Sequence, residues 1–448
     1  KSLFFHHLLP FFLFLSFFHF SFFFFLSVFS RRRRGEDKKE ILINKNTTTL
    51  IFIIRKRQFS LLKDNYFFIF LIFYIIIIVS CLQSDYVEKI FLKNIFYFRF
   101  GIFLLVVKYI INKDKEFIKN LKKILLFAFI MLFIDSLIQF TFGKNILGFS
   151  HPPGRISSFF GDESVMGSYI VRLCPLLIAL TLLTKSNKNE IVFILSISFI
   201  MAVLSGERTS IVLFLVFSLI LCLIWKYDIK KKLVFFTVFT IFIISSFTLI
   251  IKTSELAKFR LIDQTLGHIN FNYKNNKPYY KEIKINGKYY AYARNDTLLP
   301  LAYTLYIEAS KNIFLDNLIF GSGAKSYRYV SSSEKYLIKR THAAFRDKPK
   351  DFVYPGFTNV SSANTHPHNI YLQLFSETGL LGGLFISLVF IYISLMIFFS
   401  KISFEKKVIL ISLFMNLYPF ITTGNLFNNW GSVLYYYPLG ILYLKKNN

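Results

Sequence analysis

Hydrophobic residues in this chain come in long runs, and polar residues fall between them in shorter stretches. A helix needs about 17 to 25 apolar residues to cross about 30 Å of hydrocarbon. Eleven runs approach that length, which predicts an all-α integral membrane protein with about 11–12 transmembrane helices. The predicted spans are residues 3–29, 66–82, 90–111, 121–142, 166–184, 190–204, 209–225, 233–251, 372–400, 407–421 and 431–444.

Basic residues between the runs predict which side of the membrane each interval faces. Alternate short intervals hold 27 Lys and Arg in one set and four in the other. Because basic short loops stay in the cytoplasm, the first set, which includes 31–65 and 226–232, is expected to be cytoplasmic. The long interval 252–367 then falls on the outer side, where its 18 basic residues are no objection because long loops escape the rule. We read residues 1–29 as an uncleaved Phe-rich anchor, since the run is long and lacks a small-residue cleavage site.

Composition removes other classes of protein. The chain has 448 residues, of which 54% are hydrophobic and 58 are Phe, so it is neither disordered nor an ordinary soluble enzyme. A formal charge of +29 would suit nucleic acid, but the cations lie between the predicted spans, so we expect no nucleic-acid partner. Cys81, Cys174 and Cys222 all fall inside apolar runs, which indicates neither disulfides nor a thiolate metal site.

The long outer interval contains its own predicted elements. Residues 279–293 alternate apolar side chains on both sides of Asn286-Gly287, the strongest short hairpin signal. Residues 297–316 have helical spacing, and we expect this helix to lie along the membrane surface. Tyrosine is frequent throughout the interval, which favours an interfacial aromatic belt over a platform that stacks sugars.

A His-rich turn precedes the long apolar run that begins near residue 372. His366 and His368 stand there at the level of the lipid headgroups on the predicted outer side. A histidine that titrates near neutrality can act as general base toward a sugar hydroxyl; the alternative is a residue that anchors or caps the helix. The His-x-His spacing also fits a metal ligand pair, but no further cluster of ligands supports it, so we expect no metal.

Arginines stand at three other places on the predicted outer face. The turn Ser205 to Thr209 (SGERT) carries Glu207 and Arg208 between two spans, and Arg offers a planar fork of donors suited to phosphate. The alternative is an ordinary ion pair between these two residues. Arg155 and Arg260 lie in neighbouring outer intervals, where a solvated surface charge is the alternative.

Two further charges, Asp135 and Arg172, lie inside predicted spans, each about 10 Å from the outer end, so they are able to pair. Such residues serve either function or helix association. The segment Gly321 to Ser326 (GSGAKS) resembles a phosphate loop but has Ala324 where the pattern needs Gly, so we do not read it as one.

The candidate groups converge on one predicted face. They are Arg155, Arg208, Arg260, His366 and His368. Several cations beside a base of near-neutral pKa, at headgroup depth, suit a lipid diphosphate.

The sequence from His368 resembles the motif of the bacterial O-antigen ligase and polymerase superfamily. The motif is a His, then Asn, nine residues, Gly, two residues and a Gly pair, and here it is formed by His368, Asn369, Gly379, Gly382 and Gly383. The arrangement of many spans with one large outer loop before the motif is also similar. The resemblance covers most of residues 66–444.

This resemblance implies a GT-C-like fold and a metal-independent, inverting glycosyltransferase without cofactor, active at the periplasmic face of the bacterial inner membrane. It implies an undecaprenyl-diphosphate-linked glycan as donor and the lipid A core as acceptor in a ligase, or another glycan in a polymerase. The catalytic residues implied are His368 as base, with Arg208 and Arg260 on the diphosphate. The expected substrate-binding residues are Arg155, Arg172, Glu207, His366, Asn369 and Glu377.

The resulting organisation has four parts. They are an N-terminal anchor with a basic segment at 1–65, a transmembrane bundle at 66–251, the periplasmic loop at 252–367, and the C-terminal helices with the His motif at 368–448. A polysaccharide transporter or flippase is the competing class, but it would place charges at mid-membrane and favour internal repeats, and we find no repeat. A non-catalytic scaffold would leave the complete His motif without an explanation.

Overall fold

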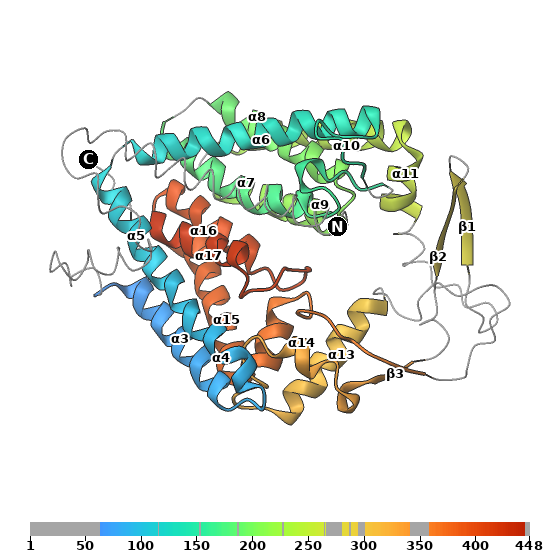
Figure 1. The fold of residues 1–448 in the computed structure, drawn as a ribbon. Helices are drawn as coiled ribbons and strands as arrows, with labels where there is room; N and C mark the ends of the chain where they lie inside the picture. The colour runs from blue at the N-terminus through green and yellow to red at the C-terminus, as the bar shows by residue number, and fades with distance from the viewer. Residues whose placement is uncertain are drawn as a thin grey trace, which may run out of the picture. The chain divides into compact units, whose positions relative to one another are not determined.

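Helices dominate the residues that the computed structural model describes, and four short strands accompany them there (Figure 1). The structure describes residues 63–114, 116–151, 154–185, 188–225, 228–263, 265, 280–285, 288–293, 301–340 and 358–443. These residues fall into two units, which we call the first unit (residues 110–257) and the second unit (residues 63–109 and 258–443).

The first unit is a helical bundle built around α7. Its elements are α6 (Phe117–Phe142), η3 (Ser158–Phe160), α7 (Met166–Leu183), α8 (Lys188–Leu204), α9 (Arg208–Ile224) and α10 (Ile229–Thr253). Helix α7 packs against α6, α8 and α9, and nearly all of its side chains are buried. Outward-facing positions remain apolar, as at Leu223 and Leu233, which are both 61% exposed. Apolar side chains on the outside of a bundle suit lipid better than water.

The second unit is arranged around α15. Its elements are α3 (Asn65–Leu82), α4 (Val87–Ile95), η2 (Phe96–Phe98), α5 (Arg99–Lys113), the π-helical turn η4 (Phe259–Asp263), β1 (Tyr280–Ile285), β2 (Lys288–Ala293), α13 (Leu301–Asp316), α14 (Tyr327–Val330), η5 (Glu334–Tyr336), β3 (Ile338–Arg340), β4 (Thr358–Val360), α15 (Ile370–Phe399), α16 (Phe404–Asn416) and α17 (Asn429–Ile441). The short helix α11 (Glu255–Lys258) belongs to the first unit except for its last residue. Helix α15 packs against α3, α13 and α16 (Figure 1).

Helix lengths confirm an all-α, multi-pass membrane protein. Six helical stretches in the described part of the chain are long and apolar enough to cross a membrane, and each overlaps a predicted span. Helices α8 and α9, with 17 residues each, and α16 and α17, with 13 each, occupy four more predicted spans but are shorter. The remaining predicted span, 3–29, lies outside the described residues.

Helix α15 is broken at Gly379, whose φ of 62° and ψ of −156° are not helical. A neighbouring segment supplies partners for the backbone groups around the break. The N–H of Ser322 donates to Ser376 O (2.9 Å), that of Gly323 to Glu377 O (2.8 Å), and that of Leu380 to Leu318 O (2.8 Å). A Cβ on Gly379 would lie 2.3 Å from Ile319 O, so the first glycine of the motif permits this backbone approach.

The predicted elements of the long interval are present, but one is placed differently. Strands β1 and β2 pair antiparallel with Ile285 opposite Lys288, which confirms the hairpin; the two turn residues themselves lie outside the described residues. Helix α13 confirms the predicted helix. Its apolar stripe, however, is buried against the protein: Leu305 and Ala309 pack with Ile338. The stripe therefore faces the protein, and the position of the helix along the membrane surface stays a prediction.

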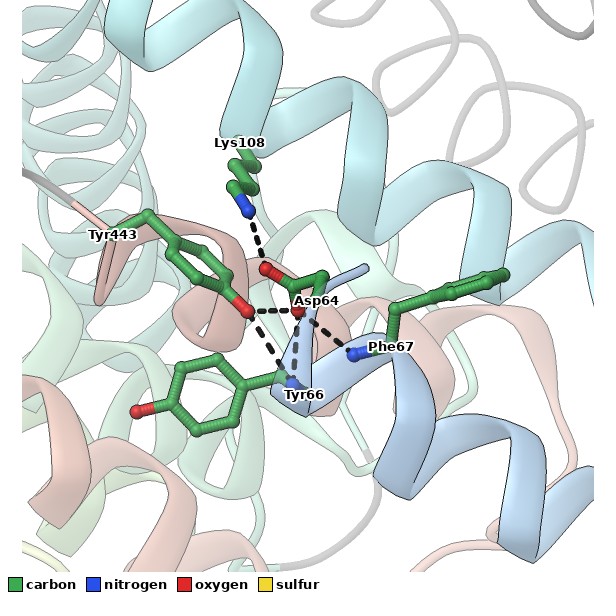
Figure 2. Close-up of polar contacts among 5 residues, drawn as sticks. All are labelled: Asp64, Tyr66, Phe67, Lys108 and Tyr443. Atoms are coloured by element: carbon green, nitrogen blue, oxygen red, sulfur yellow. Dashed lines mark hydrogen bonds and ion pairs between the residues drawn. The ribbon is translucent and has the colours of Figure 1, made fainter. Parts of the chain in front are cut away.

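A charged cluster joins three helices of the second unit at the start of α3 (Figure 2). Asp64 caps α3, because its Oδ1 accepts the N–H groups of Tyr66 and Phe67, each at 2.9 Å. Lys108 of α5 forms an ion pair with the same carboxylate, and the hydroxyl of Tyr443, after α17, donates to it. Lys108 Nζ also lies 4.0 Å from the centre of the Tyr443 ring. Asp64 therefore fastens both α5 and the C-terminal helix to α3.

Candidate functional site

The SGERT turn of the first unit lies directly against the segment that carries Arg155. Gly206 has a φ of 62°, and a Cβ there would lie 2.1 Å from Gly154 O. The N–H of Ile156 donates to Leu204 O at 3.1 Å, which holds the two segments together. The turn therefore requires glycine at this position and places Arg155 beside Glu207.

Glu207 is buried, 8% exposed, and its carboxylate is engaged by protein groups. Its Oε2 accepts from Ser168 N (3.1 Å) and Ser210 Oγ (2.8 Å), and its Oε1 lies 3.9 Å from Arg155 Nη2. Burial raises the pKa of this carboxyl, whereas the two serines and Arg155 lower it. The structure thus pairs Glu207 with Arg155. Because Glu207 is buried, its burial favours a role in positioning Arg155 over the direct contact with substrate that was expected of Glu207.

The other charges of the first unit differ in exposure. Arg208 is the first residue of α9 and is partly exposed, whereas Arg172 lies in the middle of α7 and is 5% exposed. The carboxylate of Asp135 accepts from Ser158 Oγ (2.6 Å) and Ile146 N (2.9 Å), both in the segment that follows its own helix. Arg172 and Asp135 are thus interior groups of the bundle, and burial argues against the expected contact between Arg172 and substrate.

His368 is the predicted base, and the second unit holds it in an unusual backbone conformation with φ of 53°. Its carbonyl oxygen accepts the N–H of Thr423 at 2.8 Å. Its ring lies 5.2 Å from that of Tyr306, and its Nε2 is 3.1 Å from Asn364 Nδ2. A left-handed conformation at a non-glycine residue is strained, and it persists only where surrounding contacts enforce it.

The protonation of His368 follows from Asn364. The Oδ1 of Asn364 accepts the backbone N–H of Thr365 (2.6 Å), so its Nδ2 is the atom that faces the ring. An amide NH2 group only donates, so His368 Nε2 carries a lone pair and the ring proton sits on Nδ1. Burial lowers the pKa of His368, which keeps the imidazole neutral at pH 7. The ring is thus prepared to accept a proton.

His366, which was expected to contact substrate, is hydrogen-bonded to protein groups and lies beside the ring of His368. It is 8% exposed, and its Nε2 donates to Thr423 O (3.3 Å) while its Nδ1 accepts from Thr365 Oγ1 (2.9 Å). Burial, together with the charges of His368 and Arg328, lowers the pKa of His366 to about 4. The two histidine rings lie 4.3 Å apart. His366 is therefore a neutral group that packs against His368.

Two motif residues expected to bind substrate serve the fold instead. Asn369 caps α15: its Oδ1 accepts from Tyr371 N and Leu372 N, and its Nδ2 donates to Pro419 O and Ile421 O. Glu377 is fully buried, and its carboxylate accepts from Tyr327 N (2.9 Å) and Gln373 Nε2 (3.0 Å). With their polar atoms engaged in this way, both residues position neighbouring segments, and direct contact of Asn369 and Glu377 with substrate stays a prediction.

Arg260 lies in η4, between the buried residues Phe259 and Leu261, and is itself partly exposed. The predicted residues therefore divide between the two units. The first unit holds Arg155, Arg172, Glu207 and Arg208, and the second holds Arg260, His366, His368, Asn369 and Glu377.

The groups that hold His368 were not predicted. Tyr306 comes from α13, Asn364 from the segment before the turn, and Thr423 from the segment between α16 and α17. Asn364 stands in the same polar stretch as the histidines, which is a weak local signal. For Tyr306 and Thr423 no local signal exists, because only the folded chain brings them together.

No group of three or more His, Cys, Asp or Glu side chains that would hold a metal ion occurs among the residues that the structure describes.

A comparison with protein families matches residues 192–387 to the model of the O-antigen ligase family. This segment is similar to an O-antigen ligase domain. The match confirms the resemblance, and it supports a glycosyltransferase activity of the O-antigen ligase or polymerase type with lipid-linked glycan substrates in a membrane. No curated protein matches the chain.

The O-antigen ligase domain includes the SGERT turn, Arg260 and the whole His motif. Arg155 and Arg172 precede it in the chain. The domain thus contains residues from both units, including the predicted base and both arginines expected on the diphosphate.

Proposed function

We propose that this protein transfers a glycan from undecaprenyl diphosphate to the lipid A core at the periplasmic face of the bacterial inner membrane. The observation that carries the proposal is the family match, which spans both the SGERT turn and the His motif. The neutral, half-buried imidazole of His368 supports it from the chemical side.

His368 is the general base of the proposed reaction. Its Nε2 lone pair takes the proton of the acceptor hydroxyl once that hydroxyl replaces the amide of Asn364. The hydroxyl oxygen then bonds to the anomeric carbon of the donor sugar from the face opposite the diphosphate. The bond from that carbon to the diphosphate oxygen breaks, and the lipid diphosphate leaves with the electron pair. One displacement of this kind inverts the configuration of the sugar and needs no metal.

Arg208 and Arg260 stabilise the departing diphosphate in this proposal. Negative charge grows on the leaving oxygen in the transition state, and bidentate guanidinium groups stabilise it more there than in the bound donor. Arg155, held by Glu207 and Ser164, adds a third cation at the SGERT turn.

Deletion of the gene, followed by analysis of surface and lipid-linked polysaccharide, tests this function. A ligase predicts long lipid-linked chains and a bare lipid A core, whereas a polymerase predicts single repeats on the core. The deletion strain complemented with His368→Ala should keep the protein in the membrane and lose transfer by about 10²- to 10⁴-fold, because the base is gone. Normal surface polysaccharide in that strain would contradict the proposal.

Arg208→Lys tests the role of the guanidinium. The substitution keeps the charge but loses the planar pair of donors, so we expect transfer to fall by about tenfold to a hundredfold. The control is Lys311→Arg, which makes the reverse exchange at an exposed position of α13. Full activity of Arg208→Lys would show that Arg208 is an ordinary surface charge.

A further inference from the structure

Four cations of the second unit that the proposed reaction does not use lie together around α4. Lys89 and Lys93 come from α4, Arg99 begins α5, and Lys325 follows the Gly-Ser-Gly segment. Lys325 Nζ donates to the carbonyl oxygen of Lys93. We call these four residues the cation cluster.

The contacts within the cation cluster are aromatic or neutral. Lys325 Nζ lies 5.6 Å from the Tyr97 ring and 5.8 Å from the Phe427 ring. Lys93 Nζ is 3.3 Å from the Tyr329 hydroxyl, and Lys89 Nζ is 5.3 Å from the Tyr329 ring. These rings fix the ammonium groups without neutralising them.

Acidic partners do not balance these charges. None of the four cations forms an ion pair in the part of the chain that the structure describes, although Asp85 and Glu88 are close in sequence. Burial, together with the positive charges of Arg99 and Lys93, lowers the pKa of Lys325 to about 8; the buried carboxylate of Glu377 opposes this. An anion beside the cluster would relieve this repulsion.

Large apolar side chains stand exposed among the cations. Leu92 is 65% exposed, Ile95 38% and Phe96 64%. These side chains lie near the start of the helical stretch Val87–Lys113, which is long and apolar enough to cross a membrane. Cations beside exposed apolar groups at the end of such a stretch are typical of a surface that meets anionic lipid, where the apolar groups enter the acyl region. A site for a free anion would not require these apolar residues.

We propose that the cation cluster binds the phosphate of an anionic lipid headgroup, with Leu92, Ile95 and Phe96 against the acyl chains. Lys325 lies between Tyr97 and Phe427, and Lys93 and Lys89 flank it along α4. Arg99 is oriented by a hydrogen bond to Asn429, so its guanidinium is set in place before lipid arrives. This binding is separate from glycan transfer and does not depend on the proposed reaction.

Native mass spectrometry of the purified full-length protein tests the proposal, with dioleoyl phosphatidylglycerol titrated against dioleoyl phosphatidylcholine. We expect a preference for phosphatidylglycerol. We expect Lys93→Gln with Lys325→Gln to weaken that binding about thirtyfold, since each basic residue near an anionic surface contributes about a fivefold factor. The control, Lys258→Gln with Lys311→Gln, removes the same charge from exposed positions elsewhere. Lys325→Arg keeps the charge and should retain binding.

Three outcomes would overturn the proposal. One is unchanged binding in the double variant, and another is an equal loss in the control. The third is that glycerol phosphate binds as tightly as the lipid, which would make the cluster a site for free phosphate. Thermal unfolding of each variant shows that the proteins compared are folded.

Discussion

Two polar clusters of the second unit, around Asp64 and around His368, are both built from polar and aromatic side chains. They differ in whether protein groups occupy all the hydrogen-bonding positions of the central side chain. In the first, Asp64 accepts two helix N–H groups, the Lys108 ammonium and the Tyr443 hydroxyl, so its carboxylate is surrounded by partners from the protein (Figure 2). In the second, His368 is neutral, and its Nε2 faces a single amide that a hydroxyl can replace. A saturated charged cluster stabilises the fold. A neutral ring with an accessible lone pair is suited to chemistry.

Asp64→Asn tests the stabilising half of this comparison and should have the largest effect on stability. The amide still caps α3, but it leaves the Lys108 ammonium, which is 18% exposed, without its counter-charge. We expect the free energy of unfolding to fall by about 2 kcal/mol and transfer per folded molecule to stay unchanged. Thermal unfolding in detergent and transfer assays on the same samples measure both quantities.

Two controls accompany this variant. Glu116→Gln breaks the ion pair between Glu116 and Lys119, which are both more than half exposed, and should change stability by less than about 0.5 kcal/mol. Adding Lys108→Met to Asp64→Asn should restore part of the loss, because no buried charge is left alone. Lost transfer with unchanged stability in Asp64→Asn would show that Asp64 serves the reaction and not the fold.

The pH dependence of glycan transfer tests His368 as the base. Of these tests it should show the smallest effect, because the rate should change little near pH 7. Because burial lowers the pKa of His368 below 6.5, the base is already deprotonated at pH 7. The rate should therefore reach half of its maximum at a pH below 6.5, as acidification protonates the ring. A midpoint of the pH–rate profile above pH 6.5 would show that another group is the base.

Stability must be measured across the same pH series because His366 also titrates. Its folded pKa of about 4 lies below its ordinary value of 6.5, so the unfolded chain binds the proton first. Stability is therefore lost as pH falls from about 6.5 toward 4, and it is unaffected by this group above that range. His366→Gln should flatten this acid loss of stability while the acid fall of the transfer rate remains.

The sequence predicted the helices well because lipid imposes a simple rule on them. Runs such as 372–400 must be apolar and helical wherever they lie, and α15 follows almost the same bounds. The His turn was also found, since its polar residues precede such a run. What individual polar residues do was harder to predict. Asn369, Glu377 and Glu207 were expected to contact substrate, yet each also has a partner from a segment distant in sequence: Pro419 and Ile421 for Asn369, Tyr327 for Glu377, and Ser168 for Glu207.

The apolar stripe of α13 shows the same limit in another form. Its spacing specifies one hydrophobic face but not what covers that face, and here β3 and α14 cover it instead of lipid. The sequence analysis did not read the Gly-Ser-Gly segment at 321–323 as a phosphate loop. In the structure, Gly321 lets the backbone approach α15, and Gly323 lets it approach Ser84 and Ile90. Tertiary partners decided both cases, and the local sequence does not contain them.

The break in α15 has a consequence for how the protein is assembled. An interrupted helix cannot enter a bilayer alone, because the backbone groups around Gly379 would face hydrocarbon without partners. Ser322, Gly323 and Leu318 supply those partners. The segment at 318–323 must therefore pack against α15 while α15 inserts into the membrane. During synthesis, residues 318–323 emerge before α15. Exchanging the long loop between related proteins should therefore succeed only when residues 370–379 are exchanged with it.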